Sequence, residues 1–321
     1  MYVSSKVSRL DLGWESAAFL MPTPTHVPAE LVGHPLDAVV RALFGTTWGE
    51  ARRYIERGKI TVNGAVWVDP RRKVGAHATV SLTMNAPRPR PATDLPDKAI
   101  LHVDAHLVVV NKPSGISTVP YDESETGTLD ERVRAALGPE KGARPTLGVV
   151  HRIDKETSGL VVFTRTWLAK KSLSAQFRAH TVHRRYFAVA HGDVRAQTIR
   201  SRIVANRGDG LRGSRGRGDE GQVAITHVEV LERLDGATLV ACRLETGRTH
   251  QIRIHLSELG HPVVGERVYT RGYEGPEIPS PRLMLHAAEL GFSHPVGDRE
   301  VRWRVEAPAD FAETLARLRR A

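Results

Sequence analysis

The segment Gly148–Phe163, GVVHRIDKETSGLVVF, constrains this chain more than any other, because it sets a polar stretch between two apolar runs. The run GLVVFTR has the composition of a buried β-strand. A charged group beside such a strand is costly to bury unless an opposite charge or hydrogen bonds compensate it. Asp154 and the nearby Arg152 therefore indicate either a structural ion pair or a site that uses a carboxylate.

The charge of the chain limits its partners. Its 46 Lys and Arg residues exceed its 36 Asp and Glu residues, and only nine of the basic residues are Lys. The resulting net charge of +10 predicts a polyanionic partner, either nucleic acid or an anionic membrane surface. The planar guanidinium group of arginine is suited to phosphate and to stacking on bases. A solvated basic surface without a role would have the same composition.

The compartment and the kinds of cofactor site are limited by what the sequence lacks. A single cysteine, Cys242, excludes an intramolecular disulfide and any cysteine-cluster zinc or iron–sulfur site. No apolar run reaches the roughly 18 residues of a membrane span. The first residues carry charges and prolines where a signal peptide needs an apolar core. We expect a cytoplasmic monomer that contacts no membrane.

A small module is predicted at residues 31–85, after an extension at 1–30. LDAVVRALFG has helical spacing and ends at Gly45, and Thr47 with Glu50 forms a capping box for a second helix. The dipeptide Asn63-Gly64 predicts a β-hairpin, and ATVSL predicts a further strand. Four cations on or just after the second helix form either a solvated flank or a nucleic-acid contact: Arg52, Arg53, Arg57 and Lys59.

The larger region, residues 99–321, follows a Pro-rich linker at 86–98 and is predicted as α+β. Strands are predicted in ILHVDAHLVVVNKP, RRYFAVAHG, QVAITHVEVLERL and ATLVACRL, and helices in LDERVRAAL and TWLAKKSLSAQF. HQIRIHLSELG fits a helix and a strand equally well. Residues 206–221 are rich in Arg and Gly, which predicts either a loop that becomes ordered on phosphate or a surface loop with no role.

Several reaction classes have no support in the motifs. The chain lacks the patterns GxxxxGK[ST], HExxH and GxSxG. The sequence GDGLRG, within 206–221, is followed by no helical pattern, so a dinucleotide-binding fold is not predicted. The 15 histidines are scattered, which argues against a metal site. Asp154 and Glu156 are too close in sequence to flank a glycosidic bond from opposite sides.

Three polar clusters remain, each set in apolar sequence: HRIDKETSG, HRRYFAV and LETGRTHQIRIH. Taken singly, each is as compatible with a structural ion pair as with a site. Together with NKPSG and LMLHA, and in this order, they closely resemble the RluA-like branch of the pseudouridine synthases over about Ala99–Pro308. Two departures, Ile153 for Leu and Glu266 for Asp, are expected not to affect the chemistry.

The small module carries a second resemblance. Its order of elements, through EARRYIERGKITVNG, resembles the small RNA-binding domain first described in ribosomal small-subunit protein four, over roughly Leu36 to Leu82. The opening HPLD departs from the usual arginine-led start of that domain. The resemblance implies that the four cations named above bind RNA.

The first resemblance implies a fold and a reaction. The fold is a mixed, largely antiparallel sheet flanked by helices, preceded by a small α/β RNA-binding module. The reaction is isomerisation of uridine to pseudouridine within RNA, with no metal and no cofactor. The family modifies ribosomal and transfer RNA, and the attached small module favours ribosomal RNA. Asp154 would attack the sugar or base as a nucleophile, or remove a ribose proton to open an elimination route, and both routes remain open.

Other residues receive roles through the same resemblance. Arg253 is expected to keep Asp154 ionised, because a carboxylate in an apolar pocket otherwise tends to be protonated. Tyr186 is expected to stack on the extruded uracil, and Arg152 to fill the gap that the nucleotide leaves. Three further residues are expected to bind the substrate or to order the site: Lys112, Arg248 and Gln251.

Two other functions fit part of the pattern. An RNA-binding or ribosome-assembly factor with a silent catalytic domain would have the same charge and the same small module. Such a protein would be free to lose Asp154, Tyr186 and Arg253, and all three are present. A nucleoside hydrolase would cut the same bond and release uracil.

Overall fold

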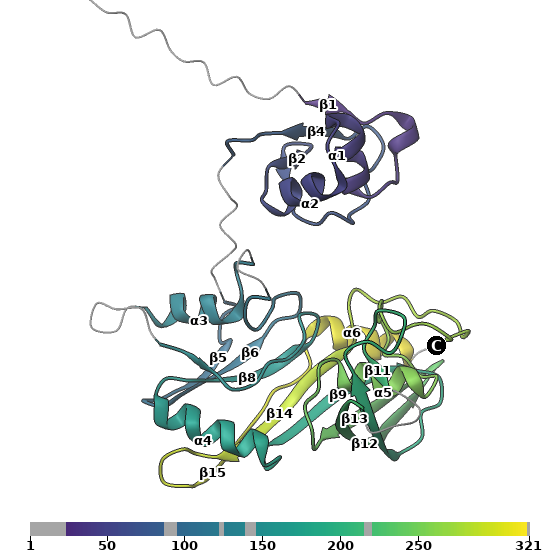
Figure 1. Cartoon of the computed structure of the whole chain (residues 1–321). Helices are drawn as coiled ribbons and strands as arrows, with labels where there is room; N and C mark the ends of the chain where they lie inside the picture. Colours follow the sequence, from purple (N-terminus) through teal and green to yellow (C-terminus); the bar gives the residue numbers. More distant parts are fainter. Residues whose placement is uncertain (1–23, 87–94, 122–124, 139–145, 215–219, 320–321) are drawn as a thin grey trace, which may run out of the picture. The chain divides into compact units, whose positions relative to one another are not determined.

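The computed structural model describes residues 24–86, 95–121, 125–138, 146–214 and 220–319. The chain forms two compact units, Met1–Arg90 and Pro91–Ala321, and each is described by itself (Figure 1). Most of the predicted linker lies outside the described residues. Within the described ranges, no helix is long and apolar enough to cross a membrane.

The small unit combines two α-helices with a four-stranded sheet. Its elements in chain order are β1 (Thr25–His26), the 3-10 helix η1 (Ala29–Leu31), α1 (Leu36–Phe44), α2 (Trp48–Glu56), β2 (Ile60–Val62), β3 (Ala65–Val66) and β4 (Thr79–Leu82). The strands follow the order β1-β4-β2-β3 and pair antiparallel. Apolar side chains of both helices and of β2 and β4, such as Leu36, Ile55 and Val80, form its core.

The local signals in this unit are confirmed. Gly45 ends α1 in the left-handed conformation, with φ 63°. The Thr47 hydroxyl accepts a hydrogen bond from the Glu50 amide, and the Glu50 carboxylate accepts one from the Thr47 amide, as a capping box requires. Asn63 and Gly64 both have positive φ, which is the backbone of the predicted two-residue turn between β2 and β3.

Strand β1 lies in the segment 1–30, where the sequence predicts only an extension. Thr25 pairs with Val80 and His26 with Thr79, so β1 forms an edge of the sheet beside β4. A two-residue strand is too short to show the alternation from which strands are predicted. The predicted start of the module at residue 31 therefore leaves out a strand that belongs to its sheet.

One sheet extends through the large unit. Its strands are β5 (Ile100–Val103), β6 (Leu107–Lys112), β7 (Gly148–Val149), β8 (Ser158–Thr164), β9 (His183–His191), β10 (Gln197–Val204), β11 (Gly213–Ser214), β12 (Gln222–Leu234), β13 (Ala237–Leu244), β14 (Leu285–Ser293) and β15 (Glu300–Arg304). The order is β11-β10-β12-β13-β9-β14-β8-β6-β5, with β15 beside β14 and β7 beside β8. Among the described strands, only β8 and β14 pair in parallel. The predicted α+β class with a mixed, largely antiparallel sheet is confirmed.

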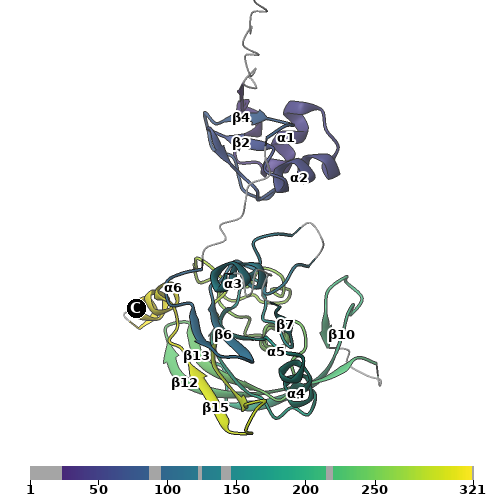
Figure 2. The same ribbon diagram turned by 90° about the vertical axis from the view of Figure 1, so that its left-hand side faces the viewer.

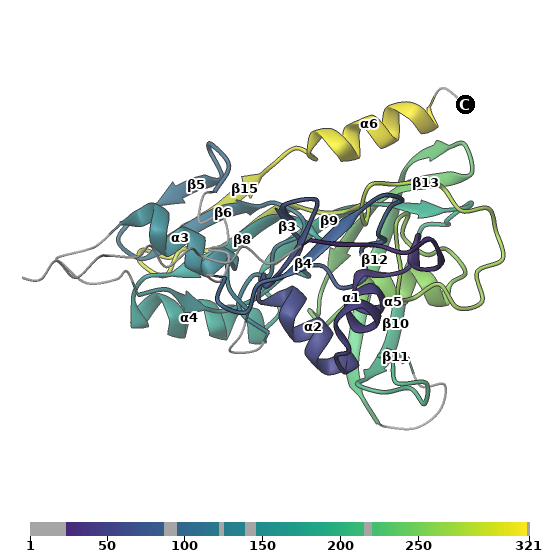
Figure 3. The same cartoon turned by 90° about the horizontal axis from the view of Figure 1, so that it is seen from above.

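Helices cover both faces of this sheet. They are α3 (Leu129–Leu137), α4 (Trp167–Arg178), α5 (Gln251–Glu258) and α6 (Ala309–Leu318). Val161 and Phe163 of β8 share a core with α3, whereas Leu160 and Val162, on the other face, share one with α4. Figures 1 and 2 show α3 and α4 on opposite sides of this part of the sheet, and Figure 3 shows α4 and α6 at opposite margins of the large unit. Strand β8 is thus buried on both faces, as predicted.

The segment HQIRIHLSELG, for which the sequence left two alternatives, forms the helix α5. His250 precedes it in the left-handed conformation, and Gly260, with φ 81°, follows it. Ile252 and Leu256 pack into the main core, whereas Ile254 belongs to a separate apolar cluster. Because apolar partners lie on two sides of the helix, the sequence shows alternation as well as helical spacing.

Part of the Arg/Gly-rich stretch 206–221 is ordered by pairing. Gly213 and Ser214 form β11 and pair with β10. Strand β10 itself is not predicted from the sequence, because few of its residues are buried. Arg207 and Asp209 form an ion pair at 3.0 Å within the same stretch. Residues 215–219 lie outside the described residues.

The start of β8 brings two strands unusually close. Gly159 has φ 114° and pairs with Ala287 of β14. A Cβ on Gly159 would lie 2.2 Å from the Ala287 carbonyl oxygen, so the position requires glycine. The adjacent Ser158 hydroxyl forms a hydrogen bond of 2.9 Å with Nδ1 of His286. These contacts fix the point at which the preceding loop, which carries Asp154, meets the sheet.

We predict that Gly159→Ala lowers the free energy of unfolding of the large unit by more than about 2 kcal/mol, because the added methyl group strains φ and also displaces β14. Gly260→Ala is the matched control, since it has a positive φ but no atom within 4 Å of the added Cβ. We expect it to cost only about 1 kcal/mol. Chemical denaturation compares the two, and equal losses would argue against the close contact.

Candidate active site

Asp154 lies in the loop between β7 and β8, which is anchored at its buried neighbour Ile153. The Thr118 hydroxyl donates a hydrogen bond to the Ile153 carbonyl at 2.9 Å and accepts one from the Ile153 amide at 3.2 Å. The Asp154 carbonyl accepts a hydrogen bond from the Thr157 amide. The Asp154 side chain is 19% exposed, so the loop holds the carboxylate at a wall without burying it completely.

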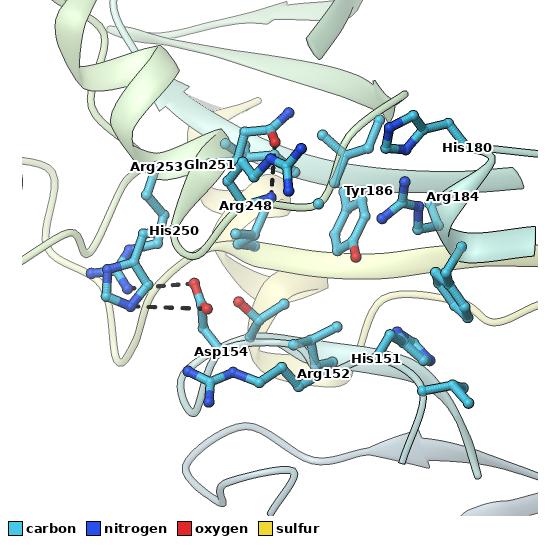
Figure 4. Close-up of a pocket in the computed structure, with 18 of the residues that line it drawn as sticks. His151, Arg152, Asp154, His180, Arg184, Tyr186, Arg248, His250, Gln251 and Arg253 are labelled. Atoms are coloured by element: carbon cyan, nitrogen blue, oxygen red, sulfur yellow. Dashed lines mark hydrogen bonds and ion pairs between the residues drawn. The ribbon is translucent and has the colours of Figure 1, made fainter. Parts of the chain in front are cut away.

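A cavity of about 370 Å³ opens beside this loop, within the range of small-molecule sites. Its wall comes from the Asp154 loop, the end of α4, β9 and the start of α5 (Figure 4). Among the described residues that line it, Asp154 is the only carboxylate, and five are arginines: Arg152, Arg178, Arg184, Arg248 and Arg253. In the described part of the chain, no three His, Cys, Asp or Glu side chains gather as a metal site requires. The cavity therefore suits an anionic ligand held beside a single carboxylate.

Arg253, on α5, lies between two carboxylates. Its Nε and Nη2 donate to Glu266 Oε2 and Oε1 at 2.6 and 2.7 Å. Its Nη1 lies 3.5 Å from Asp154 Oδ2. The structure therefore brings Asp154 and Arg253 together, but Glu266 is the closer partner of the arginine.

Glu266, one of the two departures from the family pattern, is the direct partner of Arg253. That a Glu at this position leaves the chemistry unaffected stays a prediction. The Glu266 side chain is only 1% exposed and forms a bidentate ion pair with Arg253. Burial raises the pKa of Glu266, but hydrogen bonds and charge from Arg253 outweigh it, so the pKa is lowered. Burial lowers the pKa of Arg253, and its bonds with Glu266 more than offset this, so that pKa is raised. Both groups are therefore ionised. The pair was not predicted, because no local sequence pattern links two residues 13 positions apart.

His250 also borders Asp154, although it is not among the predicted site residues. Its Nε2 lies 3.9 Å from Asp154 Oδ1, and its Nδ1 forms a hydrogen bond of 2.7 Å with the Tyr269 hydroxyl. Its backbone has φ 60°, a strained conformation for a residue other than glycine. Burial lowers the pKa of His250, so its imidazole is neutral near pH 7. Its place in the cluster LETGRTHQIRIH is the signal that could have identified it.

Tyr186 lies on β9, beside the cavity and across from the Asp154 loop (Figure 4). It pairs with Cys242 of β13 on one side and with Ala287 of β14 on the other, so the sheet holds it rigidly. Burial raises the pKa of the Tyr186 hydroxyl, although Arg184 partly opposes the shift, so the phenol is neutral. A rigid aromatic ring at a cavity wall suits stacking with a base.

Lys112 and Gln251 are buried and make their bonds within the protein. Lys112 Nζ donates to three backbone carbonyls, those of Pro113, Ile116 and Lys155. Burial lowers the pKa of Lys112 to about 7, while the charge of Asp154 opposes the shift. The Gln251 amide donates to the Ile225 carbonyl and its oxygen accepts from the Thr246 hydroxyl. These contacts fit the expected ordering of the site and leave neither side chain free for a ligand.

Arg152 and Arg248 both line the cavity. Arg152 is exposed and lies beside Asp154 on the same loop (Figure 4). Arg248 is half-buried, and its Nε donates to the Val223 carbonyl at 3.0 Å. Both are placed where a ligand in the cavity would meet them.

The four cations predicted to bind RNA in the small unit are not equivalent. Arg52 Nε pairs with Asp37 Oδ2 at 2.9 Å, and Lys59 Nζ donates to the Ala86 carbonyl. Arg53 and Arg57 are exposed at the end of α2. These two are therefore better placed than the others to contact phosphate.

Two family models match this sequence. The model described as RNA pseudouridylate synthase matches residues 106–258, which include the Asp154 loop, Tyr186 and α5. The model described as S4 domain matches residues 35–80, which lie in the small unit.

Similar whole proteins and structures are also known. The chain is 37% identical over 313 residues to ribosomal large subunit pseudouridine synthase D of Zymomonas mobilis, covering 91% of this chain and 96% of the relative. It is 34% identical over 306 residues to the protein of the same name in Pseudomonas aeruginosa, covering 91% of this chain and 94% of that relative. The solved structure of human RNA pseudouridylate synthase domain containing 4 aligns with a TM-score of 0.57 at 26% identity, covering 69% of this chain and 93% of that one.

We predict that Glu266→Gln lowers the free energy of unfolding by about 3 kcal/mol, because it leaves the buried Arg253 without its closer counter-charge. Glu245→Gln is the control, since Glu245 forms a partly exposed ion pair with His227, whose loss is expected to cost at most about 1 kcal/mol. Urea denaturation of the three proteins measures the difference.

The stabilisation that Glu266 provides depends on pH in a definite direction. Because the pKa of Glu266 is lowered on folding, its stabilisation is present above the pKa of an unfolded Glu, about 4.3, and is lost as pH falls through the lower folded value. The difference in free energy of unfolding between wild type and Glu266→Gln should be constant above about pH 5 and should shrink on acidification. A difference that is unchanged down to the acid transition would contradict the ionised pair.

Proposed function

Because this chain belongs to the RluA-like family of RNA pseudouridine synthases and is thus an isomerase that acts on RNA, we propose that it converts specific uridines of large-subunit ribosomal RNA to pseudouridine through Asp154. The observation that carries the role of Asp154 is its position. It is the only carboxylate among the described residues that line the cavity, and a guanidinium lies 3.5 Å away.

The reaction needs one anionic group. The bond from the ribose to uracil nitrogen-1 breaks, the base turns, and a new bond forms through carbon-5, with no net redox change. The Asp154 carboxylate either attacks as a nucleophile or removes a ribose proton to open an elimination route. Arg253 offsets the charge of Asp154 and fixes its direction, while Glu266 fixes Arg253. The arrangement supports both routes equally.

The other cavity residues act on the extruded nucleotide. Taking a base out of its stack costs a few kcal/mol, and a stack on an aromatic ring recovers about 1–3 kcal/mol. Tyr186 provides that ring, held between β13 and β14. The exposed Arg152 fills the gap that the nucleotide leaves in the RNA, and Arg248 contacts substrate at the cavity wall. Lys112 and Gln251 act indirectly, by fixing the loop and α5.

Ribosomal RNA is the substrate that the relatives favour. The two relatives named above are called ribosomal large subunit pseudouridine synthases. The S4-type unit and the net charge of +10 fit a large, structured polyanion. We therefore expect the activity in the cytoplasm.

We predict that Asp154→Asn abolishes pseudouridine formation, by at least about 10²–10⁴-fold, because the amide can neither attack nor accept the proton. RNA affinity should change little, since the cavity keeps its arginines. Glu156→Gln is the matched control, two positions away on the same loop but exposed and outside the cavity lining. Mass spectrometry of modified large-subunit ribosomal RNA measures the product.

Three outcomes would contradict this assignment. Pseudouridine formed by Asp154→Asn would remove the carboxylate from the reaction. Equal losses in the Glu156→Gln control would indicate a general effect of charge. Free uracil released by the wild-type chain, with no pseudouridine, would indicate a nucleoside hydrolase.

We predict a separate effect for the small unit. Arg53→Ala with Arg57→Ala should weaken RNA binding and lower the slope of log affinity against log salt by about 1 for each lost phosphate contact. The charge-matched control is Arg71→Ala with Lys73→Ala, exposed cations in the loop between β3 and β4. Filter binding at several salt concentrations measures the slopes. Equal effects of the two pairs would mean that the unit attracts RNA diffusely and does not contact it through α2.

A further inference from the structure

The segment around α4 has an unusual charge. From Thr157 to Gly192 the chain contains no Asp or Glu, but six Lys or Arg residues. Three of these lie on α4 itself, and all three are exposed: Lys170, Lys171 and Arg178. Because α4 has no carboxylate of its own, its outer surface is strongly cationic.

One face of α4 carries an exposed stripe. Trp167, Lys171, Ser174 and Arg178 follow each other at intervals of four, three and four residues, so they lie on one side of the helix. The stripe extends about 16 Å at 1.5 Å per residue. Ala169 and Leu173, which point the opposite way, are buried against β6, β8 and β14. Trp167, Lys171 and Arg178 are exposed and Ser174 is half-buried, so the stripe faces away from the core.

Trp167 is the most exposed large hydrophobic residue on α4. Its side chain is 73% exposed, although burying an indole is strongly favourable. The Lys171 ammonium lies 5.3 Å from the centre of the indole ring. An exposed aromatic ring with a cation over one face suits single-stranded nucleic acid, with phosphate at the cation and a base stacked on the ring.

The stripe is continuous with the candidate active site. Phe177, Arg178 and His180, at the end of α4 and just beyond it, line the cavity that contains Asp154. Figure 4 shows His180 and Arg184 on the other side of Tyr186 from Asp154 and His250.

Arg184 makes this end of the cavity cationic. It is 6% exposed, lies 5.6 Å from the Phe177 ring centre, and donates to a backbone carbonyl, that of Glu245. In the described residues it forms no ion pair with a carboxylate. A buried cation without a counter-charge favours an anion nearby. The cavity therefore continues toward α4 as a path for a negatively charged chain.

We propose that the α4 stripe binds the single-stranded RNA that flanks the target uridine as it leaves the cavity. Arg178 and Lys171 contact successive phosphates, and a base stacks on Trp167. This inference rests on the proposed function, because it requires that an RNA strand enters the cavity. It adds a binding surface on the large unit, distinct from that of the small unit.

The test uses the full chain and a short fluorescein-labelled oligouridylate at low salt. Trp167→Ala should weaken binding about tenfold, and Trp167→Phe should retain most of the affinity, because a benzene ring still stacks. Lys171→Ala should weaken binding and lower the salt slope by about 1. Arg195→Ala is the charge-matched control, since Arg195 is exposed just beyond the far end of β9, and it should behave as wild type. The substituted side chains are exposed, and thermal denaturation verifies that each variant is folded.

Several results would overturn the proposal. One is wild-type affinity for oligouridylate in Trp167→Ala and Lys171→Ala. Another is an equal loss of that affinity in Lys171→Ala and Arg195→Ala. A third is that Trp167→Ala and Lys171→Ala lose binding to anionic phosphatidylglycerol vesicles while their oligouridylate binding stays intact. Pseudouridine assays on large-subunit ribosomal RNA separate this proposal from the catalytic one. Trp167→Ala should raise KM and leave kcat unchanged. If the wild type makes no pseudouridine but Trp167→Ala still loses oligouridylate affinity, the catalytic proposal fails and the RNA path stands.

Discussion

The guanidinium of Arg253 organises the large unit at its candidate active site. It is a buried cation on α5, and a buried cation needs counter-charges. Glu266 supplies one counter-charge through two hydrogen bonds. Asp154, in a loop on the other side of the cavity, supplies a second, with its Oδ2 at 3.5 Å from Arg253 Nη1. The ion pair with Glu266 fixes the guanidinium, so the remaining nitrogen has a defined direction. The position of the Asp154 carboxylate is thereby set by charge as well as by the backbone of its loop.

The backbone of that loop is held from two further directions. Lys112 Nζ donates to the carbonyl of Lys155, next to Asp154 in the loop, and to the Pro113 and Ile116 carbonyls of the segment that follows β6. At the end of the loop, Gly159 lies so close to Ala287 that no side chain fits between the strands. Neither contact reaches the cavity, yet both decide where the carboxylate lies. The role proposed for Asp154 requires rigid support of this kind, because a reacting group must be held closely in place.

The charge of the cavity and the reaction belong together. The described lining residues include one carboxylate and five arginines, which is an unusual balance for a site that binds a neutral base. It is reasonable for a site that receives the base as part of a polyanion, because the phosphates on either side need cations. The same reasoning connects the cavity with the outer face of α4, where cations continue without carboxylates.

Local features were predictable from sequence, because they depend on residues within about four positions of each other. The Thr47–Glu50 capping box, the Asn63-Gly64 turn and the apolar run of β8 are of this kind. The order of the polar clusters also identified the family and singled out Asp154, Tyr186 and Arg253 as candidates. The partnership of Arg253 with Glu266, the burial of Lys112 and the choice of helix for α5 were decided only by tertiary structure. Each depends on which surfaces pack together, and a charge or apolar residue shows its partner only once distant segments of the chain are in contact.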